Sequence, residues 1–433
     1  MSEIKVNKLS PRSGTDITLG NSGTDFIVPS GATITINSGG EIVNNGTSEG
    51  FGIAWQAVTT AATLTTIAGK GYPINTTSNA CTVTLPSSAS VGDSIQIVDY
   101  AGTFATNNIT LTSSLNIEGG ALDKLLTTNR EGVTITYVDV TQGWVASSGV
   151  NSGNQALDPV PYSVDFLVVA GGGGGGGNAF PNYASGGGGA GGYRTSTQTV
   201  NGGTEITITV GDGGAVGTAG SNSSISGSGL TTITSAGGGN GGHGGNSAGN
   251  TGANGGSGGG GGYNAASGSG NTPSTSPSQG NSGGQATTGS ATAGGGGGGA
   301  GAVGSNGLGD PSATGGAGGN GTASSITGSS VTYAGGGGGG SGYTAGSGTG
   351  GTGGTGGGGA GGGTGNGTVG TANTGGGGGG ARGSFTSGSG GKGVVILSMP
   401  LASFSNTVTG SPTESDDGTT KVLIFNGDGS YTA

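Results

Sequence analysis

The stretch Val164-Asp165-Phe166-Leu167-Val168-Val169-Ala170 runs directly into seven consecutive glycines, Gly171–Gly177. Its β-branched and aromatic residues are typical of a buried β-strand. A second strand-like stretch, Lys392-Gly393-Val394-Val395-Ile396-Leu397-Ser398, follows the last of the glycine-rich sequence. We expect these two strands to pair with each other and to hold both ends of the intervening block together.

The block between the two strands has two interpretations, a disordered linker and an ordered array of glycine helices. Gly/Ser-rich sequence is usually flexible, and ordering glycine costs about 0.5–1 kcal/mol per residue more than ordering alanine. The block nevertheless carries almost no charge, since Asp310 is the only charged residue between Gly213 and Ala381. Extended helices with about three residues per turn make no internal hydrogen bonds, so their backbone groups can bond to neighbouring helices. We therefore expect an all-β protein with a glycine-rich domain of packed polyglycine II-type helices.

The composition excludes several classes of protein. Glycine accounts for 117 of the 433 residues, and charged side chains make up only 7%, against about 25% in an average globular chain. The glycines lack the strict three-residue period of collagen. A formal net charge of −10 argues against nucleic-acid binding, which depends on clustered Lys and Arg. Because Cys81 is the single cysteine and no long apolar segment occurs, we expect a soluble protein made in a cytoplasm.

The distribution of glycine and of strand-like runs divides the chain into five parts. In residues 51–150, Trp55 and Trp144 are expected to anchor the core or a subunit interface. The short strands expected in residues 1–50 cannot bury a face alone. Stacking as a β-solenoid or intertwining of three chains would bury them; we favour the trimeric shaft, with a partly ordered arm as the alternative. The expected parts are a β-repeat attachment or shaft segment (1–50), a β-sandwich-like domain (51–150), a linker (151–161), the glycine-rich polyglycine II domain (162–400) and a C-terminal β-segment (401–433).

Several motifs resemble those of phage fibre proteins. The strand 166–170 with its seven glycines, the run 186–193 and the stretch 208–214 look like the glycine-rich modules of phage tail-fibre proteins. Residues 85–93 and 98–104 are similar to a module of marine-phage fibres, and residues 5–14 to the start of cyanophage-type structural proteins. The glycine-rich block is also similar in kind to the tip adhesins of T-even-like phages, in which packed polyglycine helices form a rigid sandwich. Those adhesins are separate proteins, whereas this chain joins shaft-like and glycine-rich parts in one polypeptide.

The resemblance implies a phage tail-fibre or adhesin component, present in the virion after assembly in the host cytoplasm. It implies a homotrimeric fibre, attached through residues 1–50 to other virion proteins of the tail, baseplate or capsid. The receptor would be a host surface polysaccharide or an outer-membrane protein, recognised by loops at the distal end of the helices. Two alternatives remain: a capsid (head) fibre without receptor specificity and, less favoured, an ice-binding glycine-rich protein.

Residues at the edges of the longer connections are the candidate receptor-binding groups. Loops on rigid scaffolds commonly carry binding sites; aromatic rings can stack on sugars, and Arg can pair with an anionic sugar or a phosphate. The alternative is that the rings cover lattice edges and that the arginines bond to local carbonyls. The candidates are Phe180, Tyr183, Tyr193, Arg194, Tyr263, Tyr343 and Arg382.

We expect no catalytic, metal or cofactor site. His243 is the only histidine; it has no second ligand at metal-binding spacing and no carboxylate nearby in sequence for a Ser-His-Asp triad. The run Gly346-Ser347-Gly348-Thr349-Gly350-Gly351 fits the dinucleotide pattern. Such matches arise by chance in glycine-rich sequence, and the true motif requires a strand and a helix around it. The chain is therefore not expected to be an enzyme.

Overall fold

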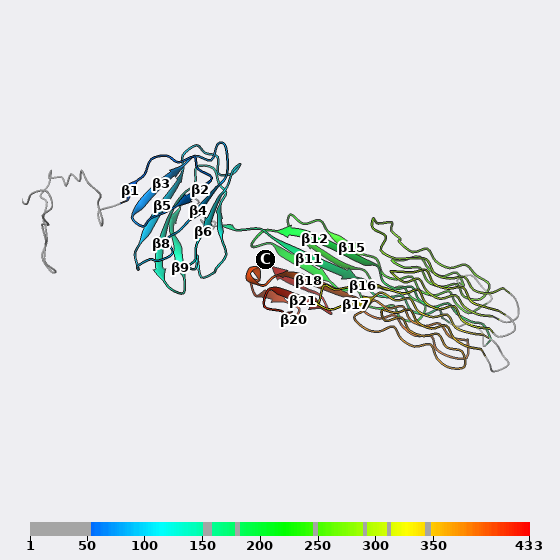
Figure 1. Cartoon of the computed structure of the whole chain (residues 1–433). Helices are drawn as coiled ribbons and strands as arrows, with labels where there is room; N and C mark the ends of the chain where they lie inside the picture. The colour runs from blue at the N-terminus through cyan, green and yellow to red at the C-terminus, as the bar shows by residue number, and fades with distance from the viewer. Residues whose placement is uncertain are drawn as a thin grey trace, which may run out of the picture. The chain divides into compact units, whose positions relative to one another are not determined.

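The computed structural model describes residues 53–149, 158–177, 182–245, 250–288, 292–309, 313–342 and 348–433. The expected shaft, residues 1–50, and residues 151–157 of the expected linker lie outside this part of the chain. The described residues confirm the all-β prediction: strands form two sandwiches, and extended glycine-rich segments connect the strands of the second one (Figure 1). Their one helical element is the 3-10 turn Leu401–Ser403. Within the same residues, no helix has the length and apolar character needed to cross a bilayer.

The first sandwich consists of two five-stranded mixed sheets. Because side chains alternate between the faces of a strand, the sequence Cys-Thr-Val-Thr of β4 buries Cys81 and Val83 and exposes the two threonines. One sheet contains, in spatial order, β1 (Ala54–Trp55), β3 (Lys70–Ile74), β5 (Ser94–Asp99), β8 (Gly132–Asp139) and β9 (Gly143–Gly149). The other contains β10 (Asp158–Pro159), β7 (Lys124–Leu126), β6 (Ile109–Thr112), β4 (Cys81–Thr84) and β2 (Thr63–Thr65).

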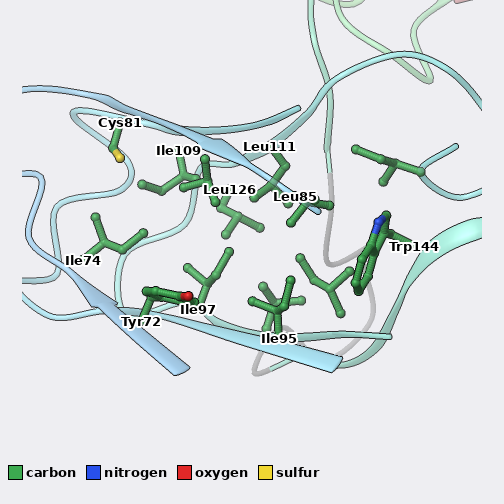
Figure 2. Close-up of a cluster of buried hydrophobic side chains, with 14 of the residues drawn as sticks. Tyr72, Ile74, Cys81, Leu85, Ile95, Ile97, Ile109, Leu111, Leu126 and Trp144 are labelled. Atoms are coloured by element: carbon green, nitrogen blue, oxygen red, sulfur yellow. The ribbon is translucent and has the colours of Figure 1, made fainter. Parts of the chain in front are cut away.

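The core of the first sandwich lies between its two sheets. Figure 2 shows Tyr72, Ile95 and Ile97 on one side of this core and Ile109 and Leu111 on the other. Trp144 is fully buried at one end and packs edge-to-face against Tyr137, with ring centroids 5.6 Å apart. Trp55, by contrast, is 53% exposed. Of the two tryptophans, only Trp144 therefore anchors this core.

The second sandwich packs two five-stranded antiparallel sheets against each other. The segment 401–433 contributes strands to both sheets, so it is part of this sandwich. The first sheet, which we call the clamp sheet, contains β12 (Tyr193–Val200), β11 (Tyr162–Val169), β18 (Val394–Pro400), β21 (Thr420–Phe425) and β20 (Thr413–Asp416). The facing sheet contains β15 (Ile233–Ser235), β14 (Ser223–Gly227), β13 (Glu205–Thr209), β22 (Gly429–Thr432) and β19 (Thr407–Thr409).

The strands that precede and follow the glycine-rich block pair with each other, as the sequence predicts. β11 and β18 are antiparallel, with a register that runs from Asp165 opposite Ser398 to Val169 opposite Val394. One face of this pair packs on the facing sheet. The other face is covered by residues that include the hairpin of β16 (Thr322–Ser324) and β17 (Val331–Tyr333). Burial on both faces explains why Phe166–Val169 is a continuous apolar run and does not alternate with polar residues.

The glycine-rich segments between Ala170 and Gly393, which we call the glycine lattice, hydrogen-bond to one another and not within themselves. The amides of residues 171–176 donate in turn to three neighbouring segments. Within each of these segments, the acceptor number falls by three as the donor number rises by three. The segment therefore repeats every third residue and runs antiparallel to these neighbours, which confirms the polyglycine II geometry. The donor–acceptor pairs are Gly171–Ser221 and Gly174–Thr218, Gly172–Gly391 and Gly175–Gly388, and Gly173–Gly189 and Gly176–Gly186.

Glycine is required in this lattice because neighbouring backbones occupy the space of a Cβ atom. A Cβ added to Gly188 would lie 2.0 Å from the carbonyl oxygen of Gly173, and one added to Gly337 would lie 2.1 Å from that of Gly378. Because glycine has no Cβ, each segment can contact neighbours on several sides. Its N–H and C=O groups can then form hydrogen bonds with these neighbours. This bonding and the close packing offset the entropic cost of ordering glycine.

Successive lattice segments run alternately away from the clamp sheet and back toward it (Figure 1). Residues 171–177 continue β11 outward, and residues 184–192 lead back into β12; residues 375–382 and 386–393 form the last such pair before β18. The turns therefore fall at two ends, a proximal end beside the strands and a distal end remote from them.

Candidate functional site

The distal end brings together three of the residues selected from the sequence. Tyr183, Tyr263 and Arg382 each lie at a turn where a lattice segment begins or ends. Ala184 forms an antiparallel bridge with Arg382, and its carbonyl accepts a hydrogen bond from the Tyr263 N–H at 3.1 Å. The Gly383 N–H donates to the Tyr183 carbonyl at 3.2 Å. These backbone bonds place three turns, distant in the sequence, side by side.

Tyr183 and Tyr263 form a stacked aromatic pair. Their ring centroids are 4.1 Å apart and the ring planes meet at 23°. Both side chains are half-buried, and the Asn250 side-chain amide donates to the Tyr263 carbonyl at 3.1 Å. The pair is therefore held in place while part of each ring stays accessible, an arrangement suited to contact with another molecule.

Arg382 lies over the ring of Phe385, with the guanidinium carbon 5.4 Å from the ring centroid. The Phe385 N–H donates to the Arg382 carbonyl at 2.8 Å, which closes the turn between the last two lattice segments. Phe385 was not among the residues selected from the sequence. Its signal was nevertheless present, since it is an aromatic residue in a short connection between glycine runs, as Tyr263 is.

Buried serine hydroxyls support the turn that carries Arg382. Ser185 Oγ donates to the Ala381 carbonyl at 2.9 Å and lies 3.1 Å from Ser387 Oγ. Ser387 Oγ donates to the Gly176 carbonyl at 2.7 Å. These bonds connect four lattice segments directly beneath the turn, so the positions of Arg382 and Phe385 are set by the lattice.

The described part of the distal end is neutral to basic. Between Gly213 and Gly391, Arg382 is the only charged residue that the structure describes, although the whole chain carries a net charge of −10. The half-buried His243 lies against the Gly177 backbone, since a Cβ at Gly177 would come within 2.7 Å of its Nδ1. No group of His, Cys, Asp and Glu suited to a metal ion occurs among the described residues. The distal end therefore offers aromatic and cationic contacts.

Tyr193 and Arg194 lie elsewhere, at the start of β12 near the proximal end. Tyr193 is the register partner of Val169; its hydroxyl donates to the Ala323 carbonyl at 3.5 Å, and burial raises its pKa. Arg194 Nη1 donates to the Thr234 carbonyl at 3.3 Å, in agreement with the alternative that the arginines bond to local carbonyls. These two residues do not join the distal cluster, and Phe180 and Tyr343 lie outside the described residues.

Comparison with known proteins agrees with the architecture of the glycine-rich part. No curated protein matches the sequence of this chain. A family model described as a glycine-rich domain matches residues 147–400, which include β11, the whole lattice and β18. The match covers more than half of the chain, and the protein belongs to this glycine-rich domain family.

Proposed function

We propose that this protein is a fibre or adhesin component of a phage tail that attaches to a host cell surface through the distal end of its glycine lattice. The observation that supports this function is the cluster of Tyr183, Tyr263, Arg382 and Phe385 on turns held together by backbone hydrogen bonds. The receptor would be a surface polysaccharide or an outer-membrane protein. Residues 1–50 would attach the chain to other virion proteins.

The lattice suits this role because it is a rigid support for short turns. Its backbone groups bond to neighbouring segments, so little conformational entropy is lost when the turns bind a partner. The accessible area of one such cluster is small, and a single contact would be weak. In a homotrimer, three copies of the cluster would bind together, and multivalency can strengthen weak contacts by about 10²–10⁴-fold.

The test is adsorption of the fluorescently labelled full chain to a panel of bacterial cells. We expect saturable adsorption to at least one host and loss of most of it in Tyr183→Ala and Phe385→Ala. Tyr100→Ala is the matched control, because Tyr100 is an aromatic residue of the first sandwich with 55% exposure. Absence of adsorption to every cell tested, together with intact infection in the presence of antibodies against the lattice, would refute receptor binding. Labelling of virions in electron micrographs without adsorption would instead favour a structural fibre, including one on the capsid.

One face of the lattice favours a second candidate function, ice binding. Thr349, Thr352 and Thr355 occupy every third position of one segment and are exposed, which spaces them about 9 Å apart. A parallel bridge aligns Thr314 of a neighbouring segment with Thr349, so threonines recur both along one segment and across to the next. A thermal-hysteresis assay decides this candidate: hysteresis that disappears in Thr352→Lys would support it, and no hysteresis in the unaltered protein would discard it.

A further inference from the structure

A groove lies on the outer face of the clamp sheet, apart from the distal end. Its volume is about 390 Å³, and it runs between β12 and the first residues after β16. Residues from β11, β12 and the β16–β17 hairpin line it: Asp165, Phe166, Thr195, Ser196, Thr197, Ser324, Ser325 and Ile326.

The register of the clamp sheet explains the polar floor of this groove. Asp165 is the partner of Thr197, and Leu167 is the partner of Thr195, so these four side chains share one face of the sheet. The hairpin covers the apolar part of that face, where Leu167 and Val169 are fully buried. The face continues beyond the hairpin as exposed Asp165, Thr195 and Thr197. The groove therefore forms where the hairpin ends and polar side chains begin.

The Asp165 carboxylate is oriented and still accessible. Thr197 Oγ1 donates to Asp165 Oδ1 at 2.5 Å, and no other hydrogen bond to this carboxylate occurs among the described residues. Oδ2 therefore keeps its capacity to accept hydrogen bonds. The hairpin lines the groove with Ser324, Ser325 and Ile326. The Ser324 hydroxyl oxygen accepts a hydrogen bond from the Ile326 N–H at 3.3 Å, and the Ser325 side chain is exposed.

The hairpin wall is fixed to the sheet. Ile326 packs against the cluster that contains Leu167, Ile396 and Tyr333. The Tyr193 hydroxyl donates to the Ala323 carbonyl in the middle of β16. The groove is therefore already formed in the absence of a ligand, as is usual for small-molecule sites.

We propose that this groove binds one neutral sugar unit of a saccharide. A ligand that fits must be small, since 390 Å³ lies near the lower end of the about 300–1,000 Å³ typical of ligand pockets. A sugar offers vicinal hydroxyls that donate to the carboxylate and exchange hydrogen bonds with Ser and Thr hydroxyls. Its C–H face matches the apolar wall at Ile326. Because Asp165 is the only charged residue in the lining, an anionic sugar is disfavoured, and one carboxylate is too few for a stable divalent-cation site.

The experiment measures binding of methyl glycosides of glucose, galactose, mannose and N-acetylglucosamine to the full chain, by saturation-transfer NMR and calorimetry. Sialic acid serves as the anionic comparator. We expect saturable binding of at least one neutral glycoside and weaker binding of sialic acid. Asp165→Asn keeps an acceptor for Thr197 and should weaken binding about tenfold or more, since a hydrogen bond to a charged group is replaced by a neutral one. Ser325→Trp should abolish binding, because the indole fills the groove from an exposed position.

Glu205→Gln is the matched control, since it removes one exposed carboxylate from β13, away from the groove, and should leave binding unchanged. The absence of saturable binding by all four neutral glycosides, tighter binding of sialic acid, or unchanged binding in Ser325→Trp would overturn the proposal. The proposal does not depend on adhesion through the distal end: Tyr183→Ala should lose adsorption and keep glycoside binding, whereas Ser325→Trp should lose glycoside binding. Circular dichroism of each variant identifies any loss of fold.

Discussion

Phe166 of β11 and Leu397 of β18 are cross-strand partners, although the whole glycine lattice separates them in the sequence. Both side chains are buried in the core between the clamp sheet and the facing sheet. After the last lattice segment, the chain thus returns to the clamp sheet at β18, directly beside β11. The stability of this strand pair and the order of the lattice are therefore coupled.

Truncation of Leu397 tests this coupling. Leu397→Ala should destabilise the second sandwich by about 2–5 kcal/mol, because it removes buried methyl groups and leaves a cavity. Hydrogen exchange followed by mass spectrometry should then show faster exchange in the lattice segments 171–177 and 386–393 as well as in β18. Thr199→Ala, at an exposed position of β12, is the control and should leave exchange unchanged. Slower or equal exchange in the lattice of Leu397→Ala would mean that the lattice is ordered independently of the clamp sheet.

Replacing glycine by alanine should destabilise the protein at a lattice position but not at an open turn position. Gly188→Ala places a Cβ 2.0 Å from the Gly173 carbonyl oxygen, so a neighbouring backbone segment must move, at a cost of about 3 kcal/mol or more. Gly365→Ala is the matched variant, because no atom lies within 4 Å of the added Cβ. It should be neutral, or stabilising by up to about 1 kcal/mol, through the lower entropy of its unfolded chain. Thermal denaturation and limited proteolysis measure the difference; equal effects of the two substitutions would contradict the packing argument.

The stacked pair at the distal end should show a measurable coupling energy. Tyr183 and Tyr263 stack with centroids 4.1 Å apart, and aromatic pairs of this kind contribute about 0.5–1.5 kcal/mol beyond the area they bury. A double-mutant cycle with Tyr183→Ala and Tyr263→Ala, read by denaturant unfolding, should give a coupling free energy in that range. Tyr183→Ala combined with Tyr100→Ala provides the control and should be additive, since Tyr100 belongs to the first sandwich. Additivity in the first pair would show that the stacking does not stabilise the fold.

The second sandwich should lose stability at alkaline pH. Burial, and secondarily the hydrogen bond between the Tyr162 and Tyr431 hydroxyls at 2.7 Å, raises the pKa of Tyr162 above its ordinary value. A pKa raised on folding means that the folded state retains a proton that the unfolded state releases above about pH 10. The stabilisation is therefore fully present below pH 10 and is lost as pH rises further.

The corresponding measurement is the free energy of unfolding between pH 8 and pH 11.5. The unaltered protein should show a steep decrease above pH 10, and Tyr162→Phe should show a shallower one, because its ring cannot ionise. Tyr100→Phe, at an exposed tyrosine, should keep the steep decrease. A Tyr162→Phe curve parallel to that of the unaltered protein would contradict this assignment.

The sequence predicts much of the fold because the relevant interactions are local or repetitive. The apolar run 166–169 identifies a strand buried on both faces, and the uncharged glycine runs predict a lattice without side chains. Trp55 illustrates the limit of such reasoning. It has the same character as Trp144 in the sequence, yet it lies in a two-residue edge strand and is largely exposed.

The candidate site was less predictable, because its residues share no sequence spacing. Tyr183, Tyr263 and Arg382 meet through backbone bonds between segments far apart in the chain. Tyr193 has a similar sequence context, beside a glycine run, but it is the first residue of β12 and lies at the opposite end of the lattice. Phe385 was missed although it meets the same criterion as Tyr263. The direction of each lattice segment, which the sequence does not state, determines which aromatic residues come together.

By itself, the sequence determined that this chain forms an all-β protein with a packed glycine domain. The absence of Cβ atoms over long runs permits close contact between backbones. The apolar strands that flank these runs need burial on both faces. Only the tertiary structure decided which glycines are neighbours, which turns share the distal end and where the groove beside Asp165 opens. The physical reason is that glycine segments have no side chains that could distinguish one neighbouring segment from another. Their arrangement follows from the register of β11 and β18, the lengths of the segments and the turns that connect them.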